Sequence, residues 1–454
     1  MKKLFGTDGM RGEAGTFPLD AATIETVGAS LAHRLRARLG RAPLVVVGRD
    51  TRESGAWLEH ALVQGLARAG AGSKSAGVIT TPGVAYLART LPADAGVVIS
   101  ASHNAYRDNG IKIFTPSGHK LDEETERLIE RDVFAQHAVV DGADSDRATL
   151  ETNAGEVADL RARYADFLAN EIGRDLSLRG FRLVLDCANG AASTLAPELF
   201  DRLGAVVTTI NNQPDGRNIN FGCGSLHTEA LQAEMLKQRA QLGVAFDGDA
   251  DRALFVDANG SLVNGDGSLW VLARYLQGRL ELNDNTVVAT VMSNIGLELA
   301  FQAEGIRLIR ADVGDKYVLE ELLRLGASLG GEQSGHIIFP RLSLAGDGLI
   351  TTLCMLRAMA HAGKDLHDLT AGFQVFPQIL VNVKVQEKRP FAEVAAIQNA
   401  VREVESALGS EGRLLLRYSG TEPLARIMIE GKSQDEIEKY AATLAGVIQQ
   451  ALGD

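Results

Sequence analysis

The sequence contains little cysteine, and its three cysteines stand far apart. Cys187, Cys223 and Cys354 form no C-x-x-C pair, so neither a zinc site nor a disulfide framework is indicated, and we expect buried thiols in a reducing compartment. Long apolar runs are also missing, since no stretch approaches the roughly 18 apolar residues of a membrane helix. The amino-terminal MKKLFGTDGM lacks the apolar core of a signal peptide. We therefore predict a cytoplasmic protein without a membrane partner.

Positive charge is also in short supply. Lysine and arginine total 46 against 58 aspartates and glutamates, which gives a formal net charge of −12. An acidic chain does not attract phosphate polymers, so we expect no nucleic-acid partner. A small anionic ligand fits only where basic residues gather in one cleft. With 45% hydrophobic and 23% charged residues over 454 positions, the composition is that of a globular protein of roughly three domains, or four small ones.

One pattern of secondary structure recurs three times along the chain. Each copy has a continuous apolar run typical of a buried parallel strand, an amphipathic helix, and a further strand; each copy ends in a polar, glycine-containing loop. Strands that alternate with helices predict βαβ crossovers and mainly parallel sheets, with ligands at the loops that follow strands. The strands are expected at 44–47 and 97–100, 183–185 and 244–246, and 287–291 and 306–309, and the loops at 101–109, 247–252 and 331–336.

The carboxy-terminal part of the sequence has a different pattern. Its β-α-β-β-α order, with alternating instead of continuous apolar strands, predicts a small α+β domain with an antiparallel sheet. Strands are expected at 379–385, 413–416 and 425–429, and helices at 394–408 and 434–452. The four predicted domains are residues 1–153, 154–257, 258–373 and 374–454.

The second copy of the pattern ends in an acidic loop. Asp247, Asp249 and Asp251 alternate directly after an apolar strand, so their carboxylates can converge on one hard cation. An EF-hand is excluded, because Arg252 occupies the position where a calcium loop needs glycine. The D-x-D motif of aspartyl phosphatases fits only in part, and a solvated acidic turn would leave three carboxylates repelling one another beside a buried strand. We predict a metal site, with Mg²⁺ as its ion.

The first copy ends in a loop that contains Ser102. By itself this serine could simply cap a turn, and the absence of a G-x-S-x-G motif argues against a hydrolase nucleophile. An Asn-Gly turn, expected over residues 109–112, would bring Lys112 onto the same loop. A phosphoryl group on Ser102 would carry close to two negative charges. Lys112, Arg11 and Arg252 are therefore electrostatically reasonable neighbours for it.

Two further polar loops have the composition of ligand sites. Residues 331–336 combine two glycines with Glu332 and Ser334, an acceptor and a hydroxyl suited to sugar hydroxyls, although a plain polar turn would have the same pattern. Residues 417–423 combine an arginine, two hydroxyls and a glycine, which favours a phosphate cradle over a tight turn with a surface arginine. The residues of this cradle are Arg417, Ser419, Gly420 and Thr421, with Arg426 just beyond.

Together the four loops resemble the motifs of the α-D-phosphohexomutase superfamily, and most closely those of its bacterial phosphoglucosamine mutases. The resemblance extends from FGTDGMRG at residues 5–12 to the loop at 417–423, nearly the whole chain. It implies an α/β fold of three similar domains with mixed or parallel sheets and a smaller C-terminal α+β domain around a central cleft. Ala105 departs from the family pattern, which usually has proline at this place in the serine loop.

The resemblance also implies a role for each loop. Ser102 would be a phosphoserine and, together with Asp247, Asp249 and Asp251, a ligand of Mg²⁺. Lys112 would give general acid/base assistance, while Arg11 and His103 stabilise charge. The substrate would be bound by Glu332, Ser334, His336, Arg417, Ser419, Gly420, Thr421 and Arg426.

The reaction implied by the resemblance is the interconversion of glucosamine 6-phosphate and glucosamine 1-phosphate. Phospho-Ser102 would give its phosphoryl group to the substrate, forming glucosamine 1,6-bisphosphate, which turns over in the cleft and returns the other phosphoryl group. The product would supply UDP-N-acetylglucosamine and cell-wall precursor synthesis, and a homodimer is the implied assembly. Two alternatives stay open: a phosphomannomutase/phosphoglucomutase, and a non-catalytic phosphosugar-binding sensor, against which the intact serine and aspartates argue.

Overall fold

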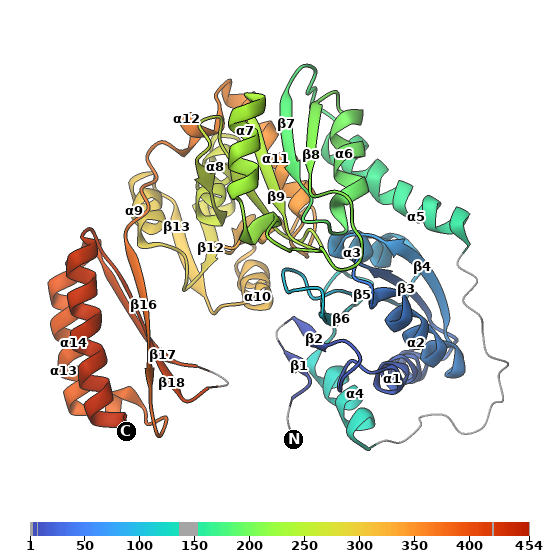
Figure 1. Ribbon diagram of the computed structural model, residues 1–454, viewed down its shortest axis with the longest axis horizontal. Helices are drawn as coiled ribbons and strands as arrows, with labels where there is room; N and C mark the ends of the chain where they lie inside the picture. Colours follow the sequence, from blue (N-terminus) through green and yellow to red (C-terminus); the bar gives the residue numbers. More distant parts are fainter. Residues whose placement is uncertain (1–2, 7, 136–152, 420–421, 454) are drawn as a thin grey trace. The chain divides into compact units, whose positions relative to one another are not determined.

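The protein is represented by a computed structural model that describes residues 3–6, 8–135, 153–419 and 422–453. The chain divides into two compact units, a larger one of residues 1–291 and 309–370 and a smaller one of residues 292–308 and 371–454. The helices and strands carry the labels of Figure 1. Within the described ranges, no helix combines the length and the apolar character that a membrane crossing requires.

The first sheet has six strands in the order β1-β2-β6-β5-β3-β4. Strand β3 runs parallel to both β4 and β5, whereas β6 runs antiparallel to β5 and to β2. The sheet is therefore mixed. Its strands are β1 (Phe5–Gly6), β2 (Gly9–Glu13), β3 (Leu44–Arg49), β4 (Gly72–Val78), β5 (Ala95–Ile99) and β6 (Asp108–Phe114), and its helices are α1 (Ala21–Leu39), α2 (Gly55–Arg68), α3 (Thr81–Thr90) and α4 (Glu123–Ala135).

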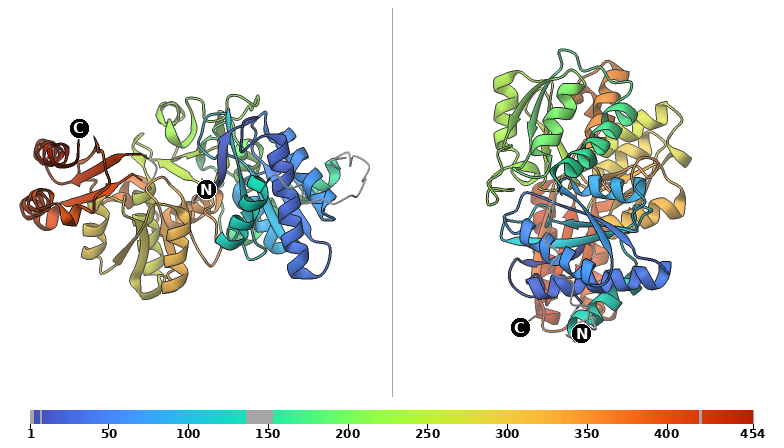
Figure 2. Two further views of the ribbon diagram at one scale, coloured as in Figure 1. Left: turned by 90° about the horizontal axis from the view of Figure 1, so that it is seen from below. Right: turned by 90° about the vertical axis from the view of Figure 1, so that its right-hand side faces the viewer.

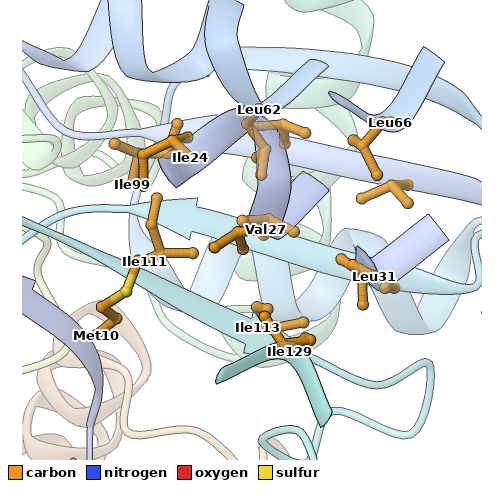
Figure 3. Packing of buried hydrophobic residues seen from close by; sticks show 14 of the residues in the cluster. Met10, Ile24, Val27, Leu31, Leu62, Leu66, Ile99, Ile111, Ile113 and Ile129 are labelled. Atoms are coloured by element: carbon orange, nitrogen blue, oxygen red, sulfur yellow. The ribbon is translucent and has the colours of Figure 1, made fainter. Parts of the chain in front are cut away.

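Helices cover both faces of this sheet. Alternate residues of each strand point to opposite faces, so both sets of side chains pack against helices. On one face, Val27 of α1 belongs to the same buried cluster as Ile111 and Ile113 of β6 (Figure 3). On the other face, an ideal Cβ at Gly48 would lie 2.5 Å from a methyl group of Val84 in α3. The strands are thus apolar on both faces, which explains their continuous apolar runs.

Helices α1 and α2 approach each other closely through two glycines. A Cβ atom at Gly65 would overlap the carbonyl oxygen of Glu25, and one at Gly28 would overlap that of Leu62. The absence of side chains at these two positions lets the helix backbones touch. This contact fixes the α1–α2 layer that covers the first sheet.

Two further sheets complete the larger unit. The second has the order β11-β10-β9-β7-β8 and the third β13-β12-β14-β15. The second sheet and its helices comprise α5 (Ala154–Asp166), β7 (Arg182–Asp186), α6 (Ala192–Arg202), β8 (Val206–Ile210), α7 (Glu229–Gln238), β9 (Leu242–Phe246), β10 (Ala253–Val256) and β11 (Leu262–Val263). The third comprises α8 (Gly265–Gly278), β12 (Thr286–Thr290), β13 (Arg307–Ala311), α10 (Asp315–Leu325), β14 (Leu329–Gly331), β15 (Ile337–Ile338), α11 (Gly348–Ala362) and α12 (Leu366–Thr370).

The three sheets share one topology. Each contains four neighbouring strands in the same order: β6-β5-β3-β4, β10-β9-β7-β8 and β15-β14-β12-β13. In each, the strand at one end of this set is antiparallel to its neighbour and follows it directly in the chain. The three predicted site loops are the connections of these hairpins. The same topology thus places a hairpin loop at the equivalent position in each of the three sheets.

The smaller unit contains a three-stranded antiparallel sheet in the order β16-β18-β17. Two helices, α13 and α14, lie on one face of this sheet (Figure 2) and share its buried core. The antiparallel α+β arrangement expected from the alternating strands is therefore confirmed. The elements are α9 (Ile295–Ala303), β16 (Gln378–Lys384), α13 (Ala395–Leu408), β17 (Arg413–Tyr418), β18 (Leu424–Glu430) and α14 (Gln434–Leu452).

One predicted local structure is wrong. The Asn109-Gly110 pair, expected as a turn, lies inside β6, and Lys112 therefore projects from a strand. A Cβ at Gly110 would lie only 2.6 Å from the carbonyl oxygen of Ser100 and 2.8 Å from that of Met10. The glycine is needed for close approach between strands and not for a turn.

The α1–α2 contact generates a stability prediction. Gly65→Ala should lower the free energy of unfolding by about 1–3 kcal/mol, because the added methyl group must push the two helix backbones apart. Gly446→Ala is the matched control, since a Cβ there meets no atom within 4 Å and alanine favours a helix over glycine by about 1 kcal/mol. Denaturant titration should show opposite shifts, and equal shifts would contradict the close contact.

Candidate functional site

The three predicted aspartates lie together in the hairpin between β9 and β10. Asp247, Asp249 and Asp251 are all buried, and one carboxylate oxygen from each lies within 4.8 Å of the others. Strand β9 is buried along its whole length, and its end fixes where the loop begins. The alternation of the aspartates along the loop thus becomes convergence in space.

This cluster fits a divalent cation. The Oδ1 atoms of Asp249 and Asp251 are buried and have no hydrogen-bond partner among the described residues. Burial raises the pKa of Asp247 well above its usual value, and the charges of Asp251 and Asp249 raise it further. Carboxylate oxygens that repel one another and lack donors are the ligands of hard cations such as Mg²⁺ or Ca²⁺.

Lys112 reaches the same cluster from β6 of the first sheet. Its Nζ lies 2.9 Å from Asp249 Oδ2, 3.2 Å from Asp251 Oδ2 and 3.2 Å from Asp8 Oδ2. Burial alone would lower the pKa of Lys112, but these carboxylates outweigh it and raise the pKa well above its ordinary value. The lysine is therefore a fixed positive charge that offsets part of the carboxylate repulsion.

Ser102 faces the aspartates from the hairpin between β5 and β6. Its Oγ donates a hydrogen bond of 2.5 Å to Asp247 Oδ2 and lies 3.2 Å from Nδ1 of His103. Burial and the charges of Arg252 and Arg11 lower the pKa of His103 to about 4. The backbone of Ser102 has φ = 51°, in the left-handed region that serine rarely adopts. The serine hydroxyl and the carboxylate cluster thus form one site.

A cavity of about 490 Å³ in the larger unit opens beside these groups. Basic residues on it are Lys3, Arg11 and Arg252, and acidic ones include Asp251 and Glu332. The cavity brings together side chains from all three sheets. Of the predicted residues, those that line it are Arg11, His103, Asp251, Glu332 and His336.

The third hairpin places its polar residues at this cavity. Glu332 Oε1 accepts a hydrogen bond of 3.1 Å from the amide of Gly314. His336 Nδ1 lies 3.5 Å from Asp251. Burial alone would lower the pKa of His336, but Asp251 and Asp315 raise it to about 9. Ser334 lies between Glu332 and His336 in the chain, and its Oγ is buried without a hydrogen-bond partner in the described structure.

Several residues of the site were missed by reasoning from the sequence. Lys120 Nζ bridges Asp8 Oδ1, at 2.7 Å, and Asp315 Oδ1, also at 2.7 Å. Thr81 Oγ1 donates a 2.6 Å hydrogen bond to Asp249 Oδ2. Asp315 lies four residues beyond the end of β13, so the rule that ligands gather after strands could have found it. Lys120 and Thr81 carry no such signal.

The fourth predicted loop belongs to the smaller unit. Arg417 of β17 stands directly opposite Arg426 of β18, and like charges in such a pair repel unless an anion lies between them. Arg426 Nη2 lies 3.3 Å from Ser419 Oγ, while its Nε is buried with no hydrogen-bond partner among the described residues. Lys388, missed from the sequence, donates to the carbonyl oxygen of Ser419 at 2.5 Å. Of the other predicted members, Gly420 and Thr421 lie outside the described residues.

Comparison with known protein families gives one consistent result along the chain. Four family profiles of phosphoglucomutase/phosphomannomutase match in order: alpha/beta/alpha domain I at residues 2–139, domain II at 162–260 and domain III at 264–376, then the C-terminal domain at 380–447. The first three matches contain the three hairpin loops, and the fourth contains the arginine pair.

The chain is also similar over its full length to proteins named phosphoglucosamine mutase. It is 49% identical to that of Solibacter usitatus over 453 residues, with 100% of both chains covered. It is 48% identical to that of Koribacter versatilis over 457 residues, covering 100% of this chain and 98% of the other. The chain thus spans 98% or more of the length of these two relatives.

Solved structures share the fold. A phosphoglucomutase/phosphomannomutase family protein from Burkholderia thailandensis matches with a TM-score of 0.78 and 25% identity, covering 99% of this chain and 98% of that one. An Aspergillus fumigatus N-acetylphosphoglucosamine mutase in complex with GlcNAc-6P and magnesium matches with a TM-score of 0.64 and 18% identity, covering 99% and 96%. The second likeness concerns the fold alone.

The carboxylate cluster generates a prediction about metal binding. Asp249→Asn removes one negative charge but keeps an oxygen that can accept from Thr81, so the fold should survive. Divalent-cation affinity should fall at least about 10-fold, because even residues that only orient metal ligands contribute about 10- to 100-fold. Titration with Mn²⁺, followed by electron paramagnetic resonance, measures the change.

The matched control is Asp257→Asn. Asp257 Oδ1 accepts hydrogen bonds from the amides of Asn259, at 2.9 Å, and Ser261, at 2.8 Å, so it is a buried aspartate of the same domain with a structural partner set. The Mn²⁺ affinity of the Asp257→Asn variant should equal that of the wild-type protein. An unchanged affinity in Asp249→Asn would exclude this hairpin as the metal site.

Proposed function

The chain belongs to the phosphoglucomutase/phosphomannomutase family, and we propose that it is a phosphoglucosamine mutase that interconverts glucosamine 6-phosphate and glucosamine 1-phosphate. The choice of glucosamine phosphates follows from full-length sequence identity of 43–49% to proteins named phosphoglucosamine mutase. The chemistry follows from one observation above all: the hydroxyl of Ser102 is hydrogen-bonded to Asp247 within a buried carboxylate cluster. A serine of that kind can carry a phosphoryl group.

The proposed reaction consists of two phosphoryl transfers. In the first, the bond between phosphorus and Ser102 Oγ breaks while a bond to the free O1 or O6 of the substrate forms. In net terms, the proton of that substrate hydroxyl passes to Ser102 Oγ. The product is glucosamine 1,6-bisphosphate together with a free serine hydroxyl. After the bisphosphate turns over, its other phosphoryl group returns to Ser102. No phosphate is gained or lost, so the net change is an isomerisation.

The residues around Ser102 supply charge and proton transfer. We assign Lys112 to charge stabilisation, since three carboxylates keep it protonated, and we propose general acid/base assistance as its second role. Arg11 and His103 line the cavity beside the serine, where they would stabilise the charge on the transferred group. His103 Nδ1 is also within 3.2 Å of the reacting oxygen. This distance supports a part in the proton transfer.

The carboxylate cluster is proposed to hold Mg²⁺. Asp247, Asp249, Asp251 and an oxygen on Ser102 would be its ligands, in keeping with the Oδ1 atoms of Asp249 and Asp251, which accept no hydrogen bond from the described residues. When bound, the ion supplies positive charge next to the phosphoryl oxygens. Lys112 and Thr81 then act on the same carboxylates, because both donate to Asp249 Oδ2 and so hold it in place.

Two further groups of residues are proposed to bind the substrate. Glu332, Ser334 and His336 would recognise sugar hydroxyls, since they combine acceptors and donors in one polar turn. The phosphate that is not reacting would be held by the cradle in the smaller unit, where the opposed arginines and the unpaired Nε of Arg426 favour an anion. This cradle consists of Arg417, Ser419, Gly420, Thr421 and Arg426, and we add Lys388 to it.

Family membership extends the proposal to the cellular setting. The domains would be residues 1–153 for the phosphoserine, 154–257 for the metal, 258–373 for the sugar and 374–454 for the phosphate. The protein would act in the cytoplasm, as a homodimer, on a phosphosugar. Its product would enter the synthesis of UDP-N-acetylglucosamine and of cell-wall precursors.

A substrate panel tests this function. The purified protein with Mg²⁺ and a trace of bisphosphate should convert glucosamine phosphates more efficiently, by kcat/KM, than glucose or mannose phosphates. Intact-mass analysis should find part of the protein heavier by one phosphoryl group on Ser102, and Ser102→Ala should nearly abolish turnover. A preference for glucose or mannose phosphates would favour the phosphomannomutase/phosphoglucomutase alternative. Binding without turnover would favour the sensor.

The cradle in the smaller unit is tested by Arg417→Ala. A charge-assisted contact with phosphate contributes about 1.5–3 kcal/mol, so kcat/KM should fall about 10- to 150-fold. Part of the loss should appear as a higher KM, because the non-reacting phosphate is held before and during transfer. Arg402→Ala, on exposed helix α13 of the same unit, should leave the kinetics unchanged. Equal kinetics for the two variants would contradict a phosphate contact at Arg417.

A further inference from the structure

Arg52 lies directly beneath the serine hairpin, with no part of its side chain exposed to solvent. Its Nη2 donates hydrogen bonds to the carbonyl oxygens of Ser102, at 3.0 Å, and Asn104, at 2.9 Å. Its Nη1 donates to the carbonyl oxygen of Asp108, at 3.0 Å, and also to that of Ala105. One guanidinium group therefore holds four backbone carbonyl oxygens of the segment from the serine hairpin to the start of β6.

The charge of Arg52 is balanced by a second buried residue. Asp50 Oδ2 accepts from Arg52 Nε at 2.9 Å and from Ser100 Oγ at 2.6 Å. Ser100 Oγ in turn accepts from the amide of Ser102 at 3.0 Å. The same ion pair therefore holds both peptide groups that flank Ser102: its amide through Ser100, and its carbonyl directly.

This double hold accounts for the backbone conformation of the serine. Ser102 has φ = 51°, a conformation that is sterically unfavourable for an L-residue and persists only where surrounding contacts impose it. If either flanking peptide turned, the direction of the Cα–Cβ bond would change. The Oγ atom would then leave the 2.5 Å contact with Asp247.

A second donor meets the hairpin from the neighbouring domain. Asn220 Nδ2 donates to the carbonyl oxygens of Ser102, at 2.8 Å, and Asn104, at 3.0 Å. Its own backbone amide donates to the carbonyl oxygen of Ala188, at 2.9 Å, in the sheet that also carries the aspartates. The serine hairpin is thus tied to the structure that places Asp247.

Stability alone does not call for an arginine at this position. Burial of an ion pair costs several kcal/mol of desolvation per ion, and well-packed apolar residues are often as stable. What the guanidinium offers is a rigid fork of five donors in one plane. All five are directed here at fixed acceptors, four backbone carbonyls and Asp50.

We propose that Arg52 is the positioning residue that fixes the direction of the Ser102 side chain, so that its oxygen, free or phosphorylated, stays aligned with the aspartate cluster and the substrate. The proposal rests on the function proposed above for Ser102. Arg52 contacts neither the substrate nor the side chain of any metal ligand, and it reaches Ser102 only through the backbone of the hairpin. The carbonyl oxygen of Ala105 accepts from Arg52 and also from the amide of Asp108, at 3.1 Å.

The test compares Arg52→Lys with Arg49→Lys. Lysine keeps the charge beside Asp50. Its single nitrogen has three N–H donors, however, and cannot reach the four carbonyl oxygens that the two terminal nitrogens of Arg52 hold. Misplacement by about 1 Å can lower a rate by about 100-fold, so kcat should fall by about that factor while KM for the sugar phosphate stays near its wild-type value. Mn²⁺ affinity should fall less than in Asp249→Asn, because the three aspartates keep their places and only the oxygen on Ser102 is displaced. The phosphorus NMR signal of phospho-Ser102 should shift and broaden.

Arg49→Lys is the matched control for a merely structural effect. Arg49 lies in the same segment of the chain, and its Nε pairs with Glu59 Oε2 at 2.9 Å, away from the hairpin contacts of Arg52. Both variants are expected to lower the melting temperature, but only Arg52→Lys should change kcat and the phosphorus signal. An equal, small effect of both variants on kcat would overturn the proposal.

Asn220→Ala keeps the proposal testable if Arg52→Lys does not fold. It removes the second donor to the same two carbonyl oxygens without leaving a buried charge, and should lower kcat without raising KM, by a smaller factor. Wild-type kcat in Asn220→Ala together with an unfolded Arg52→Lys would count against positioning. A wild-type protein that carries no transferable phosphoryl group on Ser102 would instead refute the proposed function itself.

Discussion

The mutual repulsion of three buried carboxylates is the constraint on which the rest of the site depends. Asp247, Asp249 and Asp251 converge within 4.8 Å, and a low-dielectric interior would expel such a cluster unless positive charge or hydrogen-bond donors were nearby. Lys112 from the first sheet supplies positive charge, and the hydroxyl of Ser102 supplies a hydrogen-bond donor. The partners come from another domain, so the cluster also holds the first two domains together.

Repetition of one topology explains how separate domains build a single site. In each of the three sheets, the shared set of four strands contains a parallel strand followed directly in the chain by an antiparallel neighbour, and the hairpin between them carries the polar residues. The backbone plan is therefore the same for the serine, the aspartates and Glu332. The three copies differ in the side chains that they carry at one equivalent turn.

The sequence predicts what depends on neighbours along the chain and misses what depends on distant contacts. Apolar runs correctly located the strands, and the alternating aspartates correctly indicated a cation cluster. The Asn109-Gly110 pair was misinterpreted because a glycine required by adjacent strands looks like one required by a turn. Arg52 and Lys388 were missed because their partners are carbonyl oxygens, which leave no trace in side-chain patterns. The catalytic and binding roles of the site residues stay predictions.

At Ser102, the left-handed backbone conformation is unfavourable for stability, whereas the proposed chemistry requires a serine there. Glycine adopts φ = 51° without the steric cost that a serine bears, so a change to glycine would relax the hairpin while deleting the reactive oxygen. The backbone conformation therefore favours loss of the serine, whereas the hydrogen bond from its Oγ to Asp247 favours its retention. In a duplicated copy of the gene, freed from selection for turnover, only that hydrogen bond would oppose the change to glycine, which would leave the proposed sugar and phosphate contacts in place without a serine to carry the phosphoryl group.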